Sequence, residues 1–212
     1  MTTIVYLVRH GATAANLDVP YRLQGRGLDL PLDAAGRSQA EAASRALAIA
    51  GVEVAAVVAS PLLRSRETAE IIAEPRGLEV VVESDLIEAD LGRWENLTWD
   101  QAQALDPEHH DRFHAAPGTV PYPGGESFLD VQRRVTPALA RTAAAYAGRS
   151  IVVIGHNVTC RAYLAGLLGI PIDRARAIRQ ANGGINVIRY DGEKPTVVTV
   201  NACLHLGPTS VH

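Results

Sequence analysis

The first apolar run of the chain is Ile4-Val5-Tyr6-Leu7-Val8, and it leads directly into Arg9-His10-Gly11. The run is apolar at nearly every position instead of alternating with polar residues, which predicts a strand covered on both faces. In open α/β sheets, ligands bind beyond the carboxyl ends of the strands. This stretch therefore predicts a layered α/β fold, and it places a cation and an imidazole where such a fold binds its ligand.

Three further short runs are apolar and rich in β-branched residues: Val54–Ala59, Val80–Val82 and Ile151–Ile154. Helical patterns lie between the runs, over residues 33–50, 64–74, 126–147 and from about 158 to 169. Strands that alternate with helices predict a three-layer α/β/α sandwich, with a mostly parallel sheet and helices on both faces. The last runs, Asn186–Tyr190 and Thr196–Asn201, are joined through Asp191-Gly192 and predict an antiparallel hairpin at one edge.

We expect one domain over residues 1–212 with an inserted cap. A chain of 212 residues is long enough to bury a large core. The segment over about 90–127 interrupts the alternation of strands and helices, because it holds four prolines and the Gly124-Gly125 pair. Such a stretch is typical of an inserted lid or cap and not of another sheet repeat.

The composition excludes several classes of protein. A formal net charge of −3 at pH 7 argues against a nucleic-acid binder that relies on bulk positive charge. No apolar stretch approaches the roughly 18 residues of a membrane span, and residues 1–4 carry no basic targeting signal. Cys160 and Cys203 form neither a CxxC motif nor a disulfide framework. We therefore expect a cytoplasmic protein with no nucleic-acid partner and no membrane partner.

Charged, imidazole and amide side chains also follow the other predicted strands. Arg64 comes after Val54–Ala59, Glu88 after Val80–Val82, and His156 with Asn157 directly after Ile151–Ile154. Because parallel strands end at one edge of the sheet, these residues should meet Arg9 and His10 there. Two arginines and two imidazoles suit a compact dianion such as a phosphoryl group. We further expect the helices that begin after these loops to add their N-terminal amides to the same anion.

The chemistry available to such a cluster is narrow. A neutral imidazole among arginines is a competent nucleophile toward phosphorus. Glu88 would protonate the leaving alkoxide and then, as a carboxylate, activate water, while the arginines stabilise charge on the phosphoryl oxygens. A zinc ion held by His10, His156 and Glu88 is the alternative. Two adjacent guanidinium groups would repel a divalent cation, so we expect no metal.

Several ordered motifs resemble the histidine phosphatase (phosphoglycerate mutase-like) superfamily, in its phosphatase branch. The stretch Leu7–Asn16 resembles its RHGxTxxN signature, and the likeness continues over nearly the whole chain. The other matching stretches are Gln24-Gly25, 29–32, 36–40, 60–69, 86–95, 124–127 and Gly155-His156-Asn157.

The resemblance implies a role for each matching residue. His10 would be the phosphorylated nucleophile, and Glu88 the general acid and base. The residues implied to hold the phosphoryl oxygens are Arg9, Arg64 and His156, with Asn16 assisting. Gln24 and Gly25 would lie beside the substrate. Many phosphatase members carry two glycines after the second histidine, whereas this chain has Asn157 and Val158. Asn157 therefore brings a side-chain donor to the pocket, which bears on substrate choice.

These residues predict a phosphomonoesterase that hydrolyses a small phosphorylated metabolite through a phosphohistidine, without a cofactor and with a homodimer left open. A cofactor-dependent phosphoglycerate mutase is the alternative. The resemblance implies that such a mutase carries a Glu-Arg-His-Tyr-Gly pattern at the acid and a tryptophan in the early loop. In this chain the acid is followed by Ala89-Asp90-Leu91-Gly92, and the early loop is Leu23–Arg26. Both departures favour the phosphatase. A non-catalytic phospho-ligand binding protein ranks last, because no expected catalytic residue is missing.

Some residues near these motifs allow a structural or a functional interpretation. His109, His110 and His114 have a spacing that a metal site can use, but a polar, solvent-facing cap segment is the preferred interpretation. We expect Trp94 and Trp99 to pack within the cap or core, and Trp94 is the better candidate of the two to border the site. Arg22 and Arg26 flank Gln24, either as a plain surface pair or as a means of selecting an anionic substrate.

Overall fold

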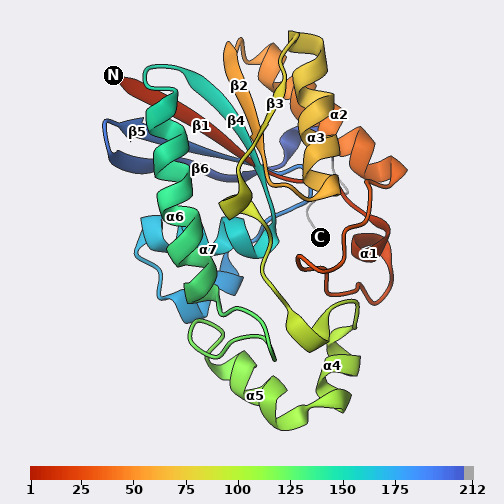
Figure 1. Cartoon of the computed structure of the whole chain (residues 1–212). Coiled ribbons are helices and arrows are strands. Elements are labelled where there is room, and N and C mark those ends of the chain that lie inside the picture. The colour runs from red at the N-terminus through yellow and green to blue at the C-terminus, as the bar shows by residue number, and fades with distance from the viewer. Residues whose placement is uncertain (208–212) are drawn as a thin grey trace.

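A six-stranded sheet forms the middle layer of the molecule, in the order β3-β2-β4-β1-β5-β6 (Figure 1). This computed structural model describes residues 1–207. Its strands are β1 (Thr2–Arg9), β2 (Val54–Ala59), β3 (Val80–Val82), β4 (Ser150–Gly155), β5 (Ile185–Asp191) and β6 (Lys194–Ala202). Strands β1 to β4 are parallel, and β5 and β6 form an antiparallel hairpin beside β1. The predicted mostly parallel sheet and its edge hairpin are confirmed.

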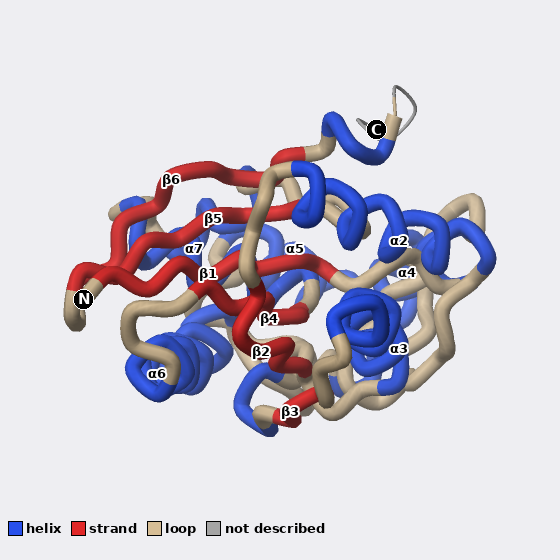
Figure 2. Tube along the Cα trace, turned by 90° about the horizontal axis from the view of Figure 1, so that it is seen from above, coloured by secondary structure: helices blue, strands red, loops and turns tan. Residues whose placement is uncertain are grey.

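Helices cover both faces of the sheet. Helices α6 (Phe128–Ala145) and α7 (Asn157–Leu168) lie on one face, and α2 (Ala34–Ile49) and α3 (Leu63–Ala73) on the other. Figure 2 looks along the sheet and shows α6 on the opposite side from α2 and α3. In β1, Leu7 belongs to the α6–α7 core and Val8 to the α2–α3 core. Two covered faces explain why the strand is apolar at successive positions, and they confirm the predicted sandwich.

The helix boundaries follow from their caps. Helix α2 begins after Asp33, whose side chain accepts a hydrogen bond from the Ala35 amide, and it is followed by Gly51 at φ +66°. Helix α6 begins two residues later than predicted. Ser127 caps it by accepting a hydrogen bond from the Asp130 amide. Glu126 precedes the helix, and its carboxylate accepts a hydrogen bond from Arg134 of α6. The expected start at residue 126 was therefore wrong, because Ser127 is the better cap.

The segment over about 90–127 lies beyond the carboxyl ends of the parallel strands (Figure 1). It contains two short helices, α4 (Trp99–Leu105) and α5 (Pro107–Ala115). Trp94 is fully buried in this segment and meets the rings of Phe113 and Tyr122 edge-on, at centroid distances of 5.4 and 6.0 Å. These rings extend the core that lies between the sheet and α6 and α7 into this segment. Among residues 1–207, no helix combines the length and apolar character that a membrane crossing requires.

Candidate active site

Most of the predicted site residues line one pocket beyond the carboxyl ends of β1 and β4. Its lining includes Arg9, His10, Asn16, Gln24, Glu88 and Asn157. Arg64 and His156 stand directly behind His10: Arg64 Nε is 3.3 Å from His10 Nε2, and the two histidine rings are 5.1 Å apart. The structure therefore brings together residues that are up to 148 positions apart in the chain, from Arg9 to Asn157.

Both ring nitrogens of His10 are in contact with the protein, Nδ1 with Gly11 and Nε2 with Arg64. Its Nδ1 lies 2.7 Å from the carbonyl oxygen of Gly11, which only accepts, so Nδ1 is the donor and Nε2 carries the lone pair. His10 is 3% exposed, and burial together with the charges of Arg64 and Arg9 holds its pKa well below the usual value. His10 is therefore neutral at neutral pH, which is the form that can attack phosphorus.

The loop that carries His10 rests on the start of α2. A Cβ atom on Gly11 would overlap the Gly36 carbonyl, and one on Gly36 would overlap the Ala12 carbonyl. The Gly11 amide also donates to the Thr68 hydroxyl of α3 at 3.1 Å. Both positions therefore require glycine for the close main-chain contact that fixes the loop.

Arg64 ties the early loop to the nucleophile. It is fully buried in the first turn of α3, and its Nη atoms donate to the carbonyls of Leu28 and Gly25 at 3.0 and 2.9 Å. Burial lowers the pKa of Arg64, yet an arginine keeps its charge at any pH relevant to the protein. Gly25 has no room for a side chain, because a Cβ there would overlap Glu95 and the Ala89 carbonyl. Gly25 thus accepts a hydrogen bond from Arg64 through its carbonyl and does not line the pocket.

His156 presents an unsatisfied ring nitrogen beside His10. Its Nε2 is 2.7 Å from the hydroxyl of Ser60, while its fully buried Nδ1 has no partner among residues 1–207. Burial and the charge of Arg64 hold the pKa of His156 well below the usual value. A buried nitrogen without a partner is costly, and an oxygen of a bound ligand would satisfy it.

Glu88 lies on the N-terminus of α7. Its carboxylate accepts hydrogen bonds from the amides of Ala89, Val158 and Thr159 at 2.9, 3.0 and 3.2 Å, and from the Thr159 hydroxyl at 3.1 Å. The expectation that α7 offers these amides to the substrate anion was therefore wrong. The positive end of the helix stabilises the chain's own carboxylate instead. The same is true of α3, whose Leu63 amide donates to the Asp29 carboxylate at 2.8 Å.

The other predicted binding residues differ in what they leave free. Arg9 donates from Nη1 to the Gln180 carbonyl at 2.6 Å, while its buried Nε has no partner in the described chain. Burial and the charge of Arg161 lower the pKa of Arg9 to about 10. The buried Oδ1 of Asn157 also lacks a protein partner within residues 1–207. Arg9 and Asn157 therefore have polar atoms that a ligand can use.

Asn16 and Gln24 are already engaged by the protein. Asn16 Oδ1 accepts from the Thr13 amide at 3.1 Å and from Asn182 at 3.3 Å. Gln24 accepts from the Thr13 hydroxyl at 2.8 Å and donates to the Leu28 carbonyl at 3.1 Å. Both residues line the pocket, but these bonds indicate that they also shape the loop after β1.

Sequence reasoning missed several of the residues that line the pocket. They are Tyr21, Trp99, Tyr122, Phe128, Arg161 and Arg176. One signal was available for Arg161, which lies four residues after Asn157 on α7 and hence on the same helix face. No pattern marks Arg176, which comes from the 3₁₀ turn Ile172–Ala177.

Three expectations about neighbouring residues can be compared with the structure. Trp94 does not border the pocket, so that expectation was wrong; Trp99 lies at the lining and Trp94 packs behind it at 6.0 Å. Arg26 pairs with Asp90 at 2.5 Å and faces away from the lining, whereas Arg22 lines the pocket.

The cap histidines pack against aromatic rings. His110 and His114 have ring centroids 4.2 Å apart, and His109 meets the ring of Trp94 edge-on at 5.6 Å. Within residues 1–207, no three His, Cys, Asp or Glu side chains are grouped to hold a metal ion. Cys160 is fully buried in the core, and burial raises the pKa of its thiol.

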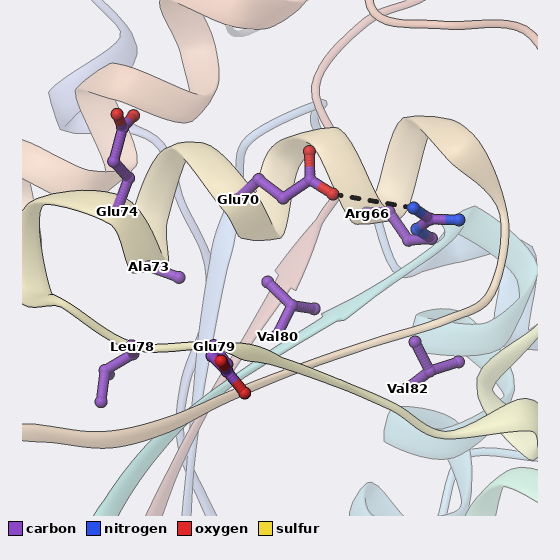
Figure 3. A pocket seen from close by; sticks show the side chains of 8 residues that line it. All are labelled: Arg66, Glu70, Ala73, Glu74, Leu78, Glu79, Val80 and Val82. Carbon is purple, nitrogen blue, oxygen red and sulfur yellow. Dashed lines mark ion pairs between the residues drawn. The ribbon is translucent and has the colours of Figure 1, made fainter.

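A separate groove lies between α3 and the edge strand β3 (Figure 3). Arg66 and Glu70 of α3 pair above it at 3.9 Å, and Val80 and Val82 of β3 form its floor. Its lining contains no histidine and none of the predicted site residues. The groove is therefore not part of the candidate active site.

Comparison with known proteins agrees with this geometry. Residues 5–203 match the Histidine phosphatase superfamily (branch 1). "Phosphoserine phosphatase 1" of Hydrogenobacter thermophilus is 32% identical over 202 residues, which cover 95% of this chain and 93% of that protein. Among solved structures, Bacillus stearothermophilus YhfR has a TM-score of 0.88 at 31% identity, covering 96% of this chain and 99% of that one.

A longer relative matches only in part. The "Bifunctional protein Rv2228c" of Mycobacterium tuberculosis is 43% identical over 154 residues, which are 73% of this chain. Those residues cover 41% of that protein, so the chain spans less than half of its length.

Proposed function

Because this chain belongs to the histidine phosphatase superfamily, we propose that it is a phosphomonoesterase that hydrolyses a small phosphorylated metabolite through a phosphohistidine on His10. The observation that carries the proposal is the state of His10, which is neutral, buried, oriented through Nδ1 and in contact with Arg64 at Nε2. The proposal treats the whole chain as one histidine-phosphatase domain, with residues 90–127 as its cap, and it uses no metal or cofactor.

In the first step, Nε2 of His10 attacks the phosphorus and the bond from phosphorus to the ester oxygen breaks. The residues that stabilise the phosphoryl oxygens are Arg9, Arg64 and His156. Arg9 Nε and His156 Nδ1 have no partner within residues 1–207, and Arg64 Nε lies beside the attacking Nε2 of His10. Glu88, in its protonated form, gives its proton to the leaving alkoxide, which departs as an alcohol. The products of this step are phosphohistidine and a Glu88 carboxylate.

In the second step, water replaces the alcohol. The carboxylate of Glu88 takes a proton from the water as its oxygen attacks phosphorus, and the bond from phosphorus to Nε2 breaks. Inorganic phosphate leaves, His10 is neutral again and Glu88 is protonated for the next cycle. The four hydrogen bonds to Glu88 support its role by position, since they hold the carboxylate at the pocket where the proton transfer takes place.

The setting that we propose follows from the sequence. We propose a cytoplasmic enzyme of small metabolites without nucleic-acid or membrane partners, and the net charge of −3 supports the lack of a nucleic-acid partner. A homodimer stays a prediction, and light scattering of the purified chain tests it.

The test of the proposed function separates hydrolysis from phosphoryl transfer between positions. Incubated with 3-phosphoglycerate and a trace of 2,3-bisphosphoglycerate, the protein should release inorganic phosphate or leave the compound unchanged. It should not equilibrate the 2- and 3-isomers. Isomerisation faster than phosphate release would establish the mutase alternative, which must keep water away from its phosphoenzyme.

A second experiment identifies the nucleophile. With a radiolabelled phosphomonoester that it hydrolyses, the wild type should form an acid-labile, base-stable adduct, as expected for phosphohistidine. His10→Ala should form none and should lose at least about a thousandfold in activity, because it removes the attacking atom. An alanine variant that retains more activity than this would rule out His10 as the nucleophile.

A further inference from the structure

We infer that the leaving group of the substrate carries a second oxyanion, a carboxylate or phosphate, which Arg161 and Arg176 bind at the pocket lining. The inference rests on the proposed phosphatase function and names the class of substrate for the same site. It goes beyond the phosphoryl-binding residues, because neither arginine contacts His10.

Arg161 is held by its Nε, and its two Nη groups are available to a ligand. Its Nε donates to the Ile178 carbonyl at 2.9 Å, and among residues 1–207 no hydrogen bond or ion pair engages its two Nη groups. The residue lies one helical turn after Asn157 and shares the pocket lining with His10 and Glu88. The stem is therefore anchored while the end of the side chain is available to a planar or tetrahedral oxyanion.

Arg176 approaches the same pocket from the 3₁₀ turn Ile172–Ala177. Its guanidinium stacks on the ring of Trp99, 4.9 Å from the centroid, and its Nη1 is 3.0 Å from Nδ1 of His114. Within residues 1–207 it forms no ion pair with a carboxylate. Stacking and the contact with the cap fix the guanidinium at the pocket without neutralising its charge.

Within residues 1–207 neither Arg161 nor Arg176 forms an ion pair, whereas other arginines do. Arg26 pairs with Asp90 at 2.5 Å. Arg134 pairs with Glu126 at 2.8 Å. Burial and then the charge of Arg176 lower the pKa of Arg161. Two like charges at a buried surface destabilise each other, and an anion bound between them relieves this cost.

Within residues 1–207, no carboxylate pairs with Arg161 or Arg176. Within the described chain, Glu88 carries the only carboxylate at the pocket lining, and its oxygens accept hydrogen bonds from Ala89 and α7. A substrate with one phosphoryl group fills the space between Arg9, Arg64 and His156. Only a substrate with a second oxyanion on its leaving group also compensates Arg161 and Arg176.

The test uses two substrates that differ at one carbon. 3-Phosphoglycerate has a carboxylate where glycerol 3-phosphate has a hydroxymethyl group. We expect the kcat/KM of the wild type to be at least about tenfold higher for 3-phosphoglycerate than for glycerol 3-phosphate, as for one charge-assisted bidentate contact. In calorimetry, His10→Ala should bind 3-phosphoglycerate at least about tenfold more tightly than glycerol 3-phosphate. Propane-1,3-diol bisphosphate against propyl phosphate is the second pair, and it tells whether a phosphate serves in place of the carboxylate.

Arg161→Met and Arg176→Met should bring both ratios toward one, since methionine retains an apolar stem and removes the charge. Arg161→Lys should restore only part of the preference, because an ammonium lacks the planar fork. Arg93→Met is the matched control. Arg93 is an exposed cap arginine paired with Asp106 at 3.0 Å, away from the pocket, and its variant should keep the wild-type ratios.

The outcomes separate this inference from the proposed function. A His10-dependent phosphatase that treats both members of each pair alike, or whose ratios survive Arg161→Met and Arg176→Met, overturns the second oxyanion site and leaves the phosphatase standing. A protein that forms no phosphohistidine with any phosphomonoester overturns the phosphatase. The calorimetric ratios still decide the second site in that case, and equal or absent binding of both members of each pair counts against it.

Discussion

The Nε–H group of Arg64 points at Nε2 of His10 across 3.3 Å. A permanent cation thus touches the nitrogen that must stay unprotonated in order to attack phosphorus. Because the contact is buried, the imidazolium form of His10 is strongly disfavoured. One residue therefore keeps His10 neutral, and in the proposed mechanism the same residue holds the phosphoryl oxygens.

Replacing Arg64 should impair the chemical step more than the fold. We expect Arg64→Ala to lower kcat/KM by about 10² to 10³, the usual effect of losing one preorganised donor to a developing oxyanion. Steady-state kinetics with a phosphomonoester measures it. Arg66→Ala is the matched control on the same helix, since Arg66 is exposed and pairs only with Glu70. A loss below tenfold in Arg64→Ala would show that Arg64 does not hold the phosphoryl group.

Glu88→Gln should distinguish substrates by their leaving groups. An alkoxide needs a proton in the transition state, whereas a nitrophenolate leaves without one, so hydrolysis of alkyl phosphates should fall far more than that of nitrophenyl phosphate. Asp90→Asn is the control, because Asp90 binds Arg26 and the Gly92 amide outside the pocket. Equal losses on both kinds of substrate would assign the acid to another residue.

The same Glu88 variant should also lose stability. One of its carboxylate oxygens becomes an amide nitrogen that faces the N–H groups at the start of α7. Leaving such donors unpaired costs about 1–3 kcal/mol, so urea unfolding should give a lower free energy of unfolding for Glu88→Gln than for the wild type. An unchanged value would mean that the hydrogen bonds between Glu88 and α7 contribute nothing to stability.

Activity should persist in an excess of chelator. In the proposed mechanism, Arg9, Arg64 and His156 supply around the phosphoryl group the stabilisation that magnesium supplies in other phosphoryl-transfer enzymes. The measurement compares phosphate release before and after treatment with EDTA, with a metal-dependent phosphatase as the control that loses activity. Recovery only on addition of a divalent ion would contradict the proposed chemistry.

The buried histidines should make the fold less stable in acid. In the native state the pKa values of His10 and His156 are held well below 6.5, so both stay neutral while the unfolded chain takes up protons. Stability should fall as the pH drops below about 6.5, by about 1 kcal/mol for each histidine between pH 7.5 and 5.5. Urea unfolding at the two pH values measures it. His156→Asn should show a smaller decline, and an equal decline would contradict this origin.

Much of this site could be predicted from where the strands end. Strand β1 leads into His10 and β4 into His156, and parallel pairing of the two strands brings the histidines together. What could not be predicted is how hydrogen bonds are distributed. The amides of α7 are sequence-independent groups, so no pattern told whether Glu88 or a ligand would receive them. Arg176 was missed because it follows no strand and belongs to no regular helix.

The contact between Gly11 and Gly36 places part of the active site in a helix that contributes no side chain to the pocket. Helix α2 supports the nucleophile through its main chain alone, at a separation that no methyl group permits. Substitution of Gly36 by alanine should therefore displace the imidazole of His10. Mutagenesis guided only by side chains within reach of a ligand would overlook that position, although the aim of the nucleophile depends on it.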